Sequence, residues 1–373
     1  MNISVKRIGT HLDHSGYGSA NRANTTALYV SGVDITLEII HQVSESAEHG
    51  WTGELCKSLL WRNIDYKINM IHLTPDMYPR YIEDGKYNIG ELFWETDRLP
   101  KEWIEPINKM QEIWTSSSTM ADLFRASGVK VPVYWFPQPV DTAEADKKWD
   151  KFDIDGHKGF MFYSIFQWIE RKNPRGLLQA YWEAFSGRND VALLLKTYRI
   201  SYTQDDYEKI QQDIEKWKRE LRLVHFPRII LTTKLLSHED IMRVHQTGDC
   251  YVTADHGEGW CRPLQEALLM GKPTIATARG GIHEYISSDH YYPIDSTYVP
   301  VVQQPWIPWY TSDQNWAQVN REEMKKKMQL VFNNKEMAMI KGFKAKEYIK
   351  EHFSYQKIGV AMRDRLEKIQ RAL

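Results

Sequence analysis

The strongest constraint on the fold is a regular alternation of short apolar segments with amphipathic ones, which starts at the N-terminus. Apolar segments that are typical of strands cover 3–9, 33–40, 67–74, 86–94, 111–117 and 131–140. Segments with helical spacing of apolar residues lie between them, at 21–32, 100–110 and 118–128. Strands and helices in succession are typical of a parallel sheet with helical crossovers. The first part of the chain therefore predicts a doubly wound α/β domain.

The alternation stops at 141–159, a charged segment without a clean period, and then restarts. Further strands are predicted at 159–166, 191–198, 228–233, 250–255 and 273–278, and helices at 173–187, 207–221, 237–248 and 262–271. The stretch 321–373 is helical with an interruption at 352–355. We therefore predict a linker at 141–159 and two Rossmann-like domains in tandem, 1–150 and 151–345, followed by a helical segment at 346–373.

Composition narrows the class of protein. The 373 residues suffice for about two domains. The net charge of -1 argues against a surface built wholly to bind nucleic acid. The cysteines Cys56, Cys250 and Cys261 are far apart, which argues against a disulfide framework or a cysteine zinc site and favours the reducing cytoplasm. The N-terminus lacks the apolar core of a signal peptide, and no apolar run is long enough to span a membrane.

The stretch 256–281 contains the clearest candidate site. A predicted strand ends near Asp255, a loop with Gly257 and Gly259 follows, and Pro263 marks the first turn of a helix. A strand, a glycine loop and a helix N-terminus form an anion site, because backbone N–H groups and the helix dipole face the ligand. Glu258 and Glu266 lie eight residues apart. Carboxylates accept hydrogen bonds from sugar hydroxyls, so this spacing predicts a site for a sugar ligand rather than a solvated acidic pair.

The segment 258–277, EGWCRPLQEALLMGKPTIAT, resembles the E-x7-E motif of retaining GT-B glycosyltransferases of the large sucrose and glycogen synthase-like family (family four, group 1 type). The resemblance extends over most of the chain. HSGYGSANRANTTAL resembles the N-terminal glycine loop and first helix of that family, and FQWIERKNPRGLLQAYWEAF resembles its donor-phosphate segment. Further similar segments are YNIGELFWETDRLPKEWIEPINKMQEIWTSSSTMADLFRASGV, VPVYWFPQPVD and QNWAQVN. The family fold implies a C-terminal helix that returns to the first domain.

The resemblance implies roles in the second domain. Glu258 would contact the donor sugar and Glu266 the nucleotide ribose, while Arg171 and Lys172 would neutralise the diphosphate leaving group. Many members of the family have an arginine where this chain has Gln167, so the division of work between the cations stays open. Lys196 is a secondary phosphate candidate. The remaining donor-binding candidates lie around Glu258: Gly257, Gly259, Trp260, Cys261 and Arg262.

In the first domain, the resemblance places Gly16 and Gly18 in a loop that faces the donor phosphate or the acceptor. His72 and Glu95 lie near predicted strand ends, and either could be the residue near the donor sugar; a structural role for His72 is the alternative. Acceptor contacts are expected from Asp13, His14 and Tyr17.

Competing chemistries lack their motifs. The chain has no H-E-x-x-H, Walker A or G-x-S-x-G motif, and HSGYGS is not the G-x-G-x-x-G of dehydrogenases. The D-I-D at 153–155 falls in the predicted linker, so the metal signature of the other nucleotide-sugar transferase fold is missing. The resemblance implies that cations and helix ends stabilise the leaving diphosphate, with no metal and no cofactor.

We therefore expect a retaining hexosyl- or pentosyltransferase that moves a sugar from a nucleotide-diphosphate-sugar donor to a saccharide or glycoconjugate acceptor. Two alternatives share the fold: transfer to a modified DNA base, which the near-neutral charge disfavours, and an epimerase or phosphorylase. A third is a non-catalytic sugar-nucleotide-binding module. The donor base, the acceptor, the oligomeric state and any peripheral contact with a membrane stay open at this stage.

Overall fold

The computed structural model describes residues 3–40, 48–154, 156–303 and 307–373, so residue 155 of the predicted linker lies outside the described part. Contacts divide the chain into two compact units, one formed by 1–143 and 350–373 and the other by 144–349. The sequence predicts boundaries at 150/151 and 345/346, and the contacts place them at 143/144 and 349/350. The segment of the predicted linker begins with a short 3-10 helix, η2 (Thr142–Asp146).

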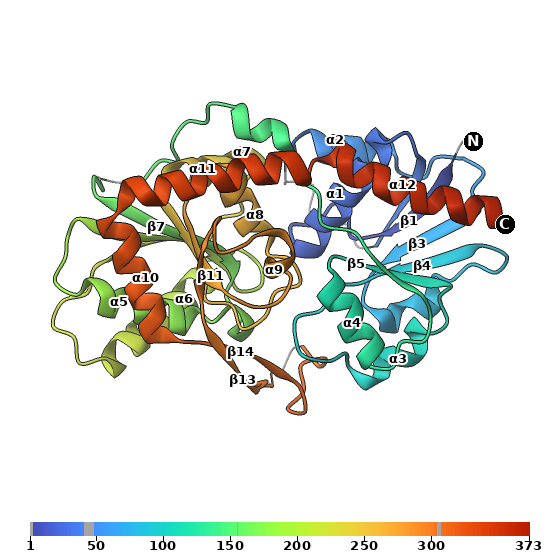
Figure 1. Ribbon diagram of the computed structural model, residues 1–373. Helices are drawn as coiled ribbons and strands as arrows, with labels where there is room; N and C mark the ends of the chain where they lie inside the picture. Colours follow the sequence, from blue (N-terminus) through green and yellow to red (C-terminus); the bar gives the residue numbers. More distant parts are fainter. Residues whose placement is uncertain (1–2, 41–47, 155, 304–306) are drawn as a thin grey trace. The chain divides into compact units, whose positions relative to one another are not determined.

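Unit 1 is a six-stranded parallel sheet in the order β2-β1-β3-β4-β5-β6 (Figure 1). Its strands are β1 (Ser4–Gly9), β2 (Asp34–Ile39), β3 (Ile68–His72), β4 (Tyr87–Glu91), β5 (Glu112–Thr115) and β6 (Val133–Trp135). Its helices are α1 (Gly16–Val30), α2 (Gly50–Ser58), η1 (Pro75–Arg80), α3 (Lys101–Ile107), α4 (Ser118–Ala126) and α12 (Tyr355–Ala372). The sequence places each of these strands correctly but makes several too long. The predicted strand at 131–140 keeps three residues, because prolines in this stretch cannot donate to a ladder.

The helix α1 begins earlier than the sequence predicts. The segment around Gly16 and Gly18 is expected to be a loop, but it forms the first turn of α1, whose N-cap is Ser15. The Ser15 side chain accepts from the Gly18 N–H at 3.1 Å. A Cβ at Gly18 would lie 2.4 Å from the Asp13 carbonyl oxygen, so glycine is needed here for close approach rather than for a turn.

The last helix, α12, packs against α1 on one face of the unit 1 sheet. Ser354 caps its start, at the break that the sequence predicts. Ile358, Met362 and Leu366 are buried at helical spacing. A Cβ at Gly359 would lie 1.9 Å from the Ala27 carbonyl oxygen, so the two backbones approach closely at this point.

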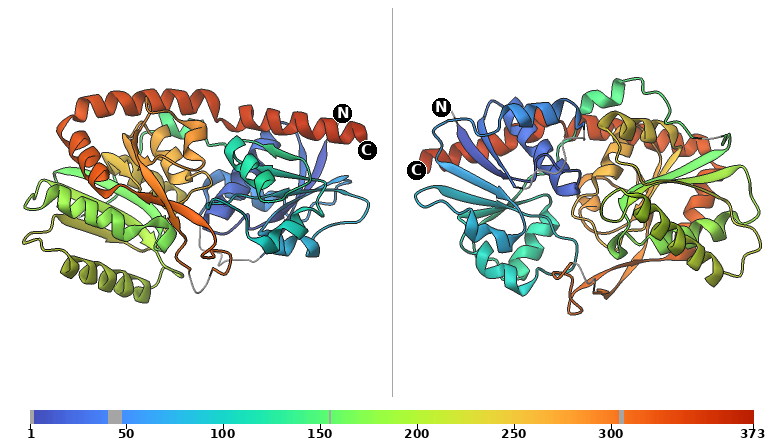
Figure 2. Two further views of the ribbon diagram at one scale, coloured as in Figure 1. Left: turned by 60° about the horizontal axis from the view of Figure 1, so that its bottom comes forward. Right: turned by 180° about the vertical axis from the view of Figure 1, so that it is seen from behind.

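Unit 2 contains a second six-stranded parallel sheet, in the order β12-β11-β10-β7-β8-β9, and an antiparallel pair, β13-β14 (Figure 2). The strands are β7 (Phe160–Gln167), β8 (Val191–Tyr198), β9 (Arg228–Thr232), β10 (Cys250–Val252), β11 (Thr274–Thr277), β12 (Tyr292–Ile294), β13 (Ser296–Pro300) and β14 (Asn315–Val319). The helices are η3 (Glu170–Lys172), α5 (Pro174–Phe185), α6 (Gln204–Glu220), α7 (His238–Thr247), α8 (Arg262–Leu269), α9 (Ile282–Tyr285), α10 (Arg321–Asn333) and α11 (Lys335–His352). The sequence analysis does not predict the strands β12, β13 and β14, the helices α2 and α9, or the short 3-10 helices.

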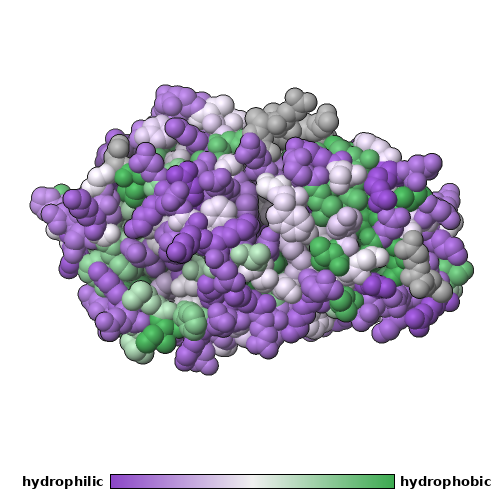
Figure 3. All heavy atoms as spheres, turned by 90° about the horizontal axis from the view of Figure 1, so that it is seen from above, coloured by the Kyte–Doolittle hydropathy of each residue, from purple (hydrophilic) through white to green (hydrophobic). Residues whose placement is uncertain are grey.

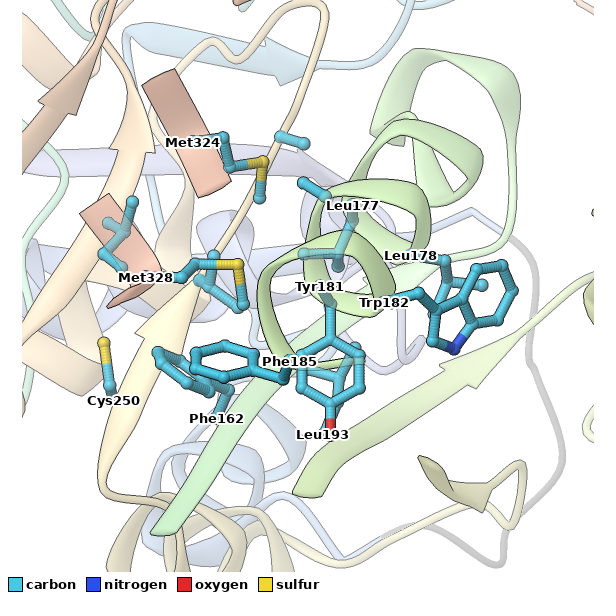
Figure 4. Close-up of a cluster of buried hydrophobic side chains, with 14 of the residues drawn as sticks. Phe162, Leu177, Leu178, Tyr181, Trp182, Phe185, Leu193, Cys250, Met324 and Met328 are labelled. Carbon is cyan, nitrogen blue, oxygen red and sulfur yellow. The ribbon is translucent and has the colours of Figure 1, made fainter. Parts of the chain in front are cut away.

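The central strands of unit 2 are apolar along their length because helices cover both sides of them. On one side, Phe162 and Leu193 pack with Tyr181 and Phe185 of α5 and with Met328 of α10 (Figure 4). On the other side, Tyr163 lies against His245 of α7, at 5.5 Å between ring centroids. Successive residues of β7 thus contact different helical layers, as the alternation of side chains along a strand requires.

The surface is mainly hydrophilic in the view of Figure 3, with smaller hydrophobic patches. Over the described residues, no helix has both the length and the apolar character that a bilayer crossing requires.

Candidate functional site

The strand order of unit 2 reverses between β7 and β10, the two central strands. In doubly wound sheets, ligands bind outside the carboxyl ends of the strands at this switch point. The segment 168–173 follows β7, and the segment 253–261 follows β10. Both contain predicted site residues, so the topology brings the R-K-N segment and the E-x7-E segment to one place.

Hydrogen bonds between backbone and side chains hold the two segments together. Asn173 has a left-handed backbone (φ 47°) and caps α5, and its side chain donates to the Ala254 carbonyl at 3.1 Å. The His256 N–H donates to the Arg171 carbonyl at 2.8 Å. These bonds fix Arg171 and Lys172 next to the loop that carries Glu258.

Glu258 accepts hydrogen bonds from both predicted cations. Arg171 Nη1 lies 3.0 Å from Glu258 Oε1 and 2.7 Å from the Gly257 carbonyl oxygen. Lys172 Nζ donates to the same carboxylate oxygen of Glu258 and lies 3.7 Å from Asp255 Oδ1. Glu258 is buried, and both cations are 13% exposed. Charge-assisted bonds of this kind are stronger than neutral ones, so the cluster is preorganised.

Gly280 and Gly281, which the sequence analysis did not single out as site residues, pack against the backbone of the loop that carries Glu258. The Gly281 N–H donates to the Glu258 carbonyl at 3.0 Å. A Cβ would lie 2.0 Å from the Gly259 carbonyl oxygen at Gly281 and 2.5 Å from the Glu258 carbonyl oxygen at Gly280. Only residues without a side chain allow this approach. The signal in the sequence is the adjacent pair in ARGG, within the stretch already singled out.

The residues after Glu258 form the entry to α8. Cys261 is its N-cap and has a left-handed backbone with φ 62°, unusual for a residue other than glycine. The Trp260 ring stacks on Tyr285 at 4.3 Å and donates from Nε1 to Gln265 at 2.9 Å. The side chains of Trp260 and Cys261 are therefore buried in the protein.

Glu266 lies on α8 and is 20% exposed at its side chain. Its carboxylate oxygens are 3.5 Å from His245 Nε2 and 3.9 Å from Arg262 Nη2. Burial by itself would raise the pKa of Glu266, but the neighbouring His245 ring and the charge of Arg262 hold the pKa below its ordinary value. Glu266 is therefore an anion at neutral pH, able to accept from a ligand hydroxyl.

Lys196 lies near the carboxyl end of β8 and is buried. Its Nζ faces the rings of Tyr202 at 4.9 Å and Tyr198 at 5.5 Å. Burial lowers the pKa of Lys196 to about 8, so most of the amine is still charged at neutral pH.

Asp255, Glu258 and Cys261 offer ligand atoms within 4.8 Å of one another. The ammonium of Lys172 contacts Glu258 and lies near Asp255, so a cation already occupies this place. Burial also raises the pKa of the Cys261 thiol to about 12, which keeps it protonated and a poor metal ligand. The three residues do not fit a metal centre.

The switch point of unit 1 lies between β1 and β3, because the chain runs from β1 to β2 on one side and returns to β3 on the other. His72 ends β3, is fully buried, and lies 5.2 Å from Tyr17 between ring centroids. Burial lowers the pKa of His72 to about 4, so the ring is neutral. Neither ring nitrogen of His72 has a hydrogen-bond partner within the described residues. A buried nitrogen without a partner marks a place where a ligand group or a water can donate.

Three polar residues of this region were not singled out by sequence reasoning: Arg7, Asn24 and Glu91. Arg7 donates to both carboxylate oxygens of Glu91, at 2.5 and 3.0 Å, and Asn24 donates at 3.2 Å. His72 Nδ1 lies 3.5 Å from Glu91 Oε2. The signal in the sequence is a charged residue inside each of two apolar strands, since a buried charge needs a partner.

The other candidates of unit 1 are less well placed. Asp13 accepts from the Ser15 N–H at 2.8 Å and from its hydroxyl at 2.6 Å, so its carboxylate is engaged in its own turn. His14 packs on His49 at 4.8 Å. Glu95 lies beyond the end of β4 and is half-buried, whereas the carboxylate next to His72 belongs to Glu91.

Comparisons with known proteins bear on the sequence pattern of one segment and on the fold of the chain. Residues 215–295 match the family model of "Glycosyl transferases group 1". Sucrose-phosphate synthase from Thermosynechococcus elongatus is similar in structure, with a TM-score of 0.71 and 12% identity over 100% of both chains. Anabaena HepE, solved with UDP and glucose, has a TM-score of 0.68 and 12% identity over 98% of this chain and 100% of its own.

TarM of S. aureus is also similar, with a TM-score of 0.57 and 17% identity over 80% of this chain and 54% of its own. No curated protein sequence matches significantly. The segment 215–295 thus has the sequence pattern of the group 1 glycosyl transferases, and the chain has the fold of the GT-B glycosyltransferases.

Proposed function

We propose that the chain is a glycosyltransferase that moves a sugar from a nucleotide-diphosphate-sugar donor to a hydroxyl of a saccharide or glycoconjugate, with retention at the anomeric carbon. The observation that carries this proposal is the convergence of Arg171 and Lys172 on Glu258 at the switch point of unit 2. The match of the family model over 215–295 supports it. HepE was solved with UDP-glucose, so UDP-glucose is the first donor to test.

In the cluster of Arg171, Lys172 and Glu258, the two cations can exchange the glutamate carboxylate for a bound diphosphate. Without donor, one carboxylate neutralises two cations; when a diphosphate binds, Arg171 and Lys172 can turn to it. Glu258 is then released to accept hydrogen bonds from sugar hydroxyls. In the reaction, the bond between C1 and the diphosphate oxygen breaks and a bond from the acceptor oxygen to C1 forms on the same face. The acceptor proton passes to the leaving diphosphate, whose developing charge the two cations stabilise.

The remaining residues take supporting roles in this proposal. Glu266 would accept from the ribose, and the backbone from Gly257 to Arg262 would face the sugar and diphosphate. Lys196 is a second phosphate candidate. In unit 1, His72 would accept a hydrogen bond from the donor sugar, and Tyr17 would contact the acceptor. No metal and no further cofactor enters the proposed reaction.

The test is a UDP-release assay with UDP-glucose, with and without saccharide acceptors, on Arg171→Ala and Lys172→Ala. Each variant should lower kcat about 10²–10³-fold, by analogy with the loss of one oxyanion donor. Lys109→Ala, an exposed lysine of unit 1, is the matched control. If both variants keep kcat and UDP affinity within about twofold, which is below the effect of one charge-assisted hydrogen bond, the diphosphate binds elsewhere.

The same assay separates the alternatives. A non-catalytic module would bind UDP-glucose but release no UDP with any acceptor. The anomeric configuration of the product, read by NMR, tests retention directly.

A further inference from the structure

Unit 2 contains a pocket of about 490 Å³ between the start of α5 and the junction of β14 with α10. Its lining includes Glu170, Gln179, His256, Gln318 and Asn320, but not Arg171, Lys172 or Glu258. The volume is in the range of about 300–1,000 Å³ that ligand pockets occupy. Most such pockets are lined mainly by apolar residues, whereas most of the residues that line this one are polar or charged, which favours a hydrophilic ligand.

His256 lies at the wall of this pocket with a defined tautomer. Its ring stacks on Trp316 at 4.7 Å, and its Nδ1 lies 2.6 Å from the Ala317 carbonyl oxygen. A carbonyl only accepts, so Nδ1 carries the proton and donates. The neutral ring then has a lone pair on Nε2. Burial lowers the pKa of His256, which favours this neutral form.

Glu170 provides a second acceptor beside the first. Its Oε1 lies 3.9 Å from His256 Nε2, and its side chain is half-exposed. A carboxylate oxygen and an unprotonated nitrogen cannot bond to each other, because neither has a hydrogen to donate. A ligand that satisfies both must bring donors of its own.

The positive groups at the rim are already engaged. Arg175 lies 2.6 Å from Glu220, and Arg321 donates to Gln179 at 3.0 Å and lies 3.6 Å from Glu183. The amide side chains of Gln318 and Asn320 add donors and acceptors in the same wall. This balance favours a neutral ligand with several hydroxyl groups over an anion.

We propose that this pocket is a saccharide site in which sugar hydroxyls donate to His256 Nε2 and to the Glu170 carboxylate. The site is additional to the donor site and does not depend on the proposed transfer reaction. It adjoins the donor loop through the backbone, since the His256 N–H donates to the Arg171 carbonyl. A saccharide bound here would therefore contact Glu170, which precedes Arg171 in the chain, and His256, which is bonded to the Arg171 backbone.

The experiment uses the full chain with histidine labelled by ¹⁵N, in the presence of UDP so that the donor site is occupied. Glucose, maltose and inorganic phosphate are titrated separately, and the signal of His256 is assigned with the variant His256→Gln. The proposal expects the sugars, and not phosphate, to shift the Nε2 signal of His256. Failure of UDP to bind would count against the proposed transfer reaction. The sugar titrations would still test the saccharide pocket, because they are followed at His256.

Glu170→Ala provides the second measurement. Its side chain is half-exposed, so the variant should fold, and it should weaken sugar binding about fivefold, as expected for one lost hydrogen bond. Glu336→Ala, an acidic residue in the first turn of α11, is the matched control and should leave sugar affinity unchanged. Sugars that do not perturb His256, sugars that bind Glu170→Ala as well as the parent, or a response to phosphate alone would each overturn the proposal.

Discussion

Arg7 and Glu91 form a two-pronged ion pair in the interior of unit 1, where their side chains are 1% and 2% exposed. The two residues come from β1 and β4, which are separated in the sheet by β3. Burial by itself would raise the pKa of Glu91, but the charge of Arg7 outweighs it and holds the pKa below its usual value. The pair is therefore charged throughout the neutral range.

Removing one partner should destabilise unit 1 strongly, because the other charge stays buried. Glu91→Leu is expected to lower the free energy of unfolding by about 3–5 kcal/mol. The double variant Arg7→Met/Glu91→Leu should recover most of this loss, since it leaves no buried charge. Urea unfolding, monitored by circular dichroism, measures the stability of the single and the double variant. A single variant that is as stable as the parent would contradict the assignment of a buried pair.

The buried His72 should make stability depend on pH. Its pKa is lowered to about 4 in the folded chain, so between its unfolded value near 6.5 and pH 4 only the unfolded chain takes up the proton. The stability that the neutral His72 ring contributes is therefore fully present above pH 6.5 and is lost as the pH falls towards 4. It amounts to roughly 3 kcal/mol, from about 1.4 kcal/mol for each pKa unit.

This prediction is checked by comparing urea unfolding of the parent and His72→Gln at pH 7 and pH 4.5. The variant should lose less stability between these two values than the parent. His225→Gln, which replaces an exposed histidine, should follow the parent. Equal pH dependence in His72→Gln and the parent would show that His72 is not buried as a neutral ring.

Glu258→Ala should separate binding from turnover. Its loss removes the acceptor for sugar hydroxyls, so transfer should fall at least as far as for loss of one transition-state contact, about 10²-fold. The same change frees Arg171 and Lys172 from their anionic partner, so UDP should bind several times more tightly. Isothermal titration calorimetry with UDP and the UDP-release assay measure the two effects.

The sequence suggests that Glu258, as a loop residue after a glycine, can be truncated at little cost in stability. The structure corrects this expectation, because Glu258 is buried and neutralises two cations. We therefore expect Glu258→Ala to lose about 1–3 kcal/mol of stability, as for other groups whose buried charged partner is removed. UDP should restore part of that loss by binding the folded state. Glu208→Ala, on the exposed side of α6, controls for loss of a surface carboxylate.

Gly281→Ala should displace the loop that carries Glu258. Its Cβ would lie 2.0 Å from the Gly259 carbonyl oxygen, so the loop must shift while the sheet beneath it stays in place. We expect a loss of UDP affinity and transfer with the fold preserved, as judged by circular dichroism. Gly85→Ala is the control for an added methyl group away from the site: nothing lies within 4 Å of its Cβ, although its φ of 75° brings backbone strain that Gly281, with φ -61°, does not have. Parental UDP affinity in Gly281→Ala would show that the contact does not position Glu258.

The sequence by itself determined the strands of both sheets except β12, most of the helices and the break at Ser354. These features follow from the local periodicity of apolar residues, which records which side chains are buried. A local pattern also marked Glu258 and Glu266, because a glycine loop between a strand end and a helix is visible within one segment. Arg171 and Lys172 were singled out by the resemblance of their segment to the donor-phosphate segment of the GT-B family. The start of α1 was wrong, because Gly16 and Gly18 fit a loop as well as a helix until the capping by Ser15 is known.

Only the tertiary structure decided which distant residues meet. Arg171 and Glu258 are 87 positions apart, and they come together because β7 and β10 are neighbours in the sheet. Arg7 and Glu91 meet across 84 positions, and His256 and Ala317 across 61. Strand order is set by the packing of whole layers rather than by the sequence near any one strand. Local sequence patterns therefore could not predict any of these pairs, although the charged and polar residues among them can be seen in the sequence.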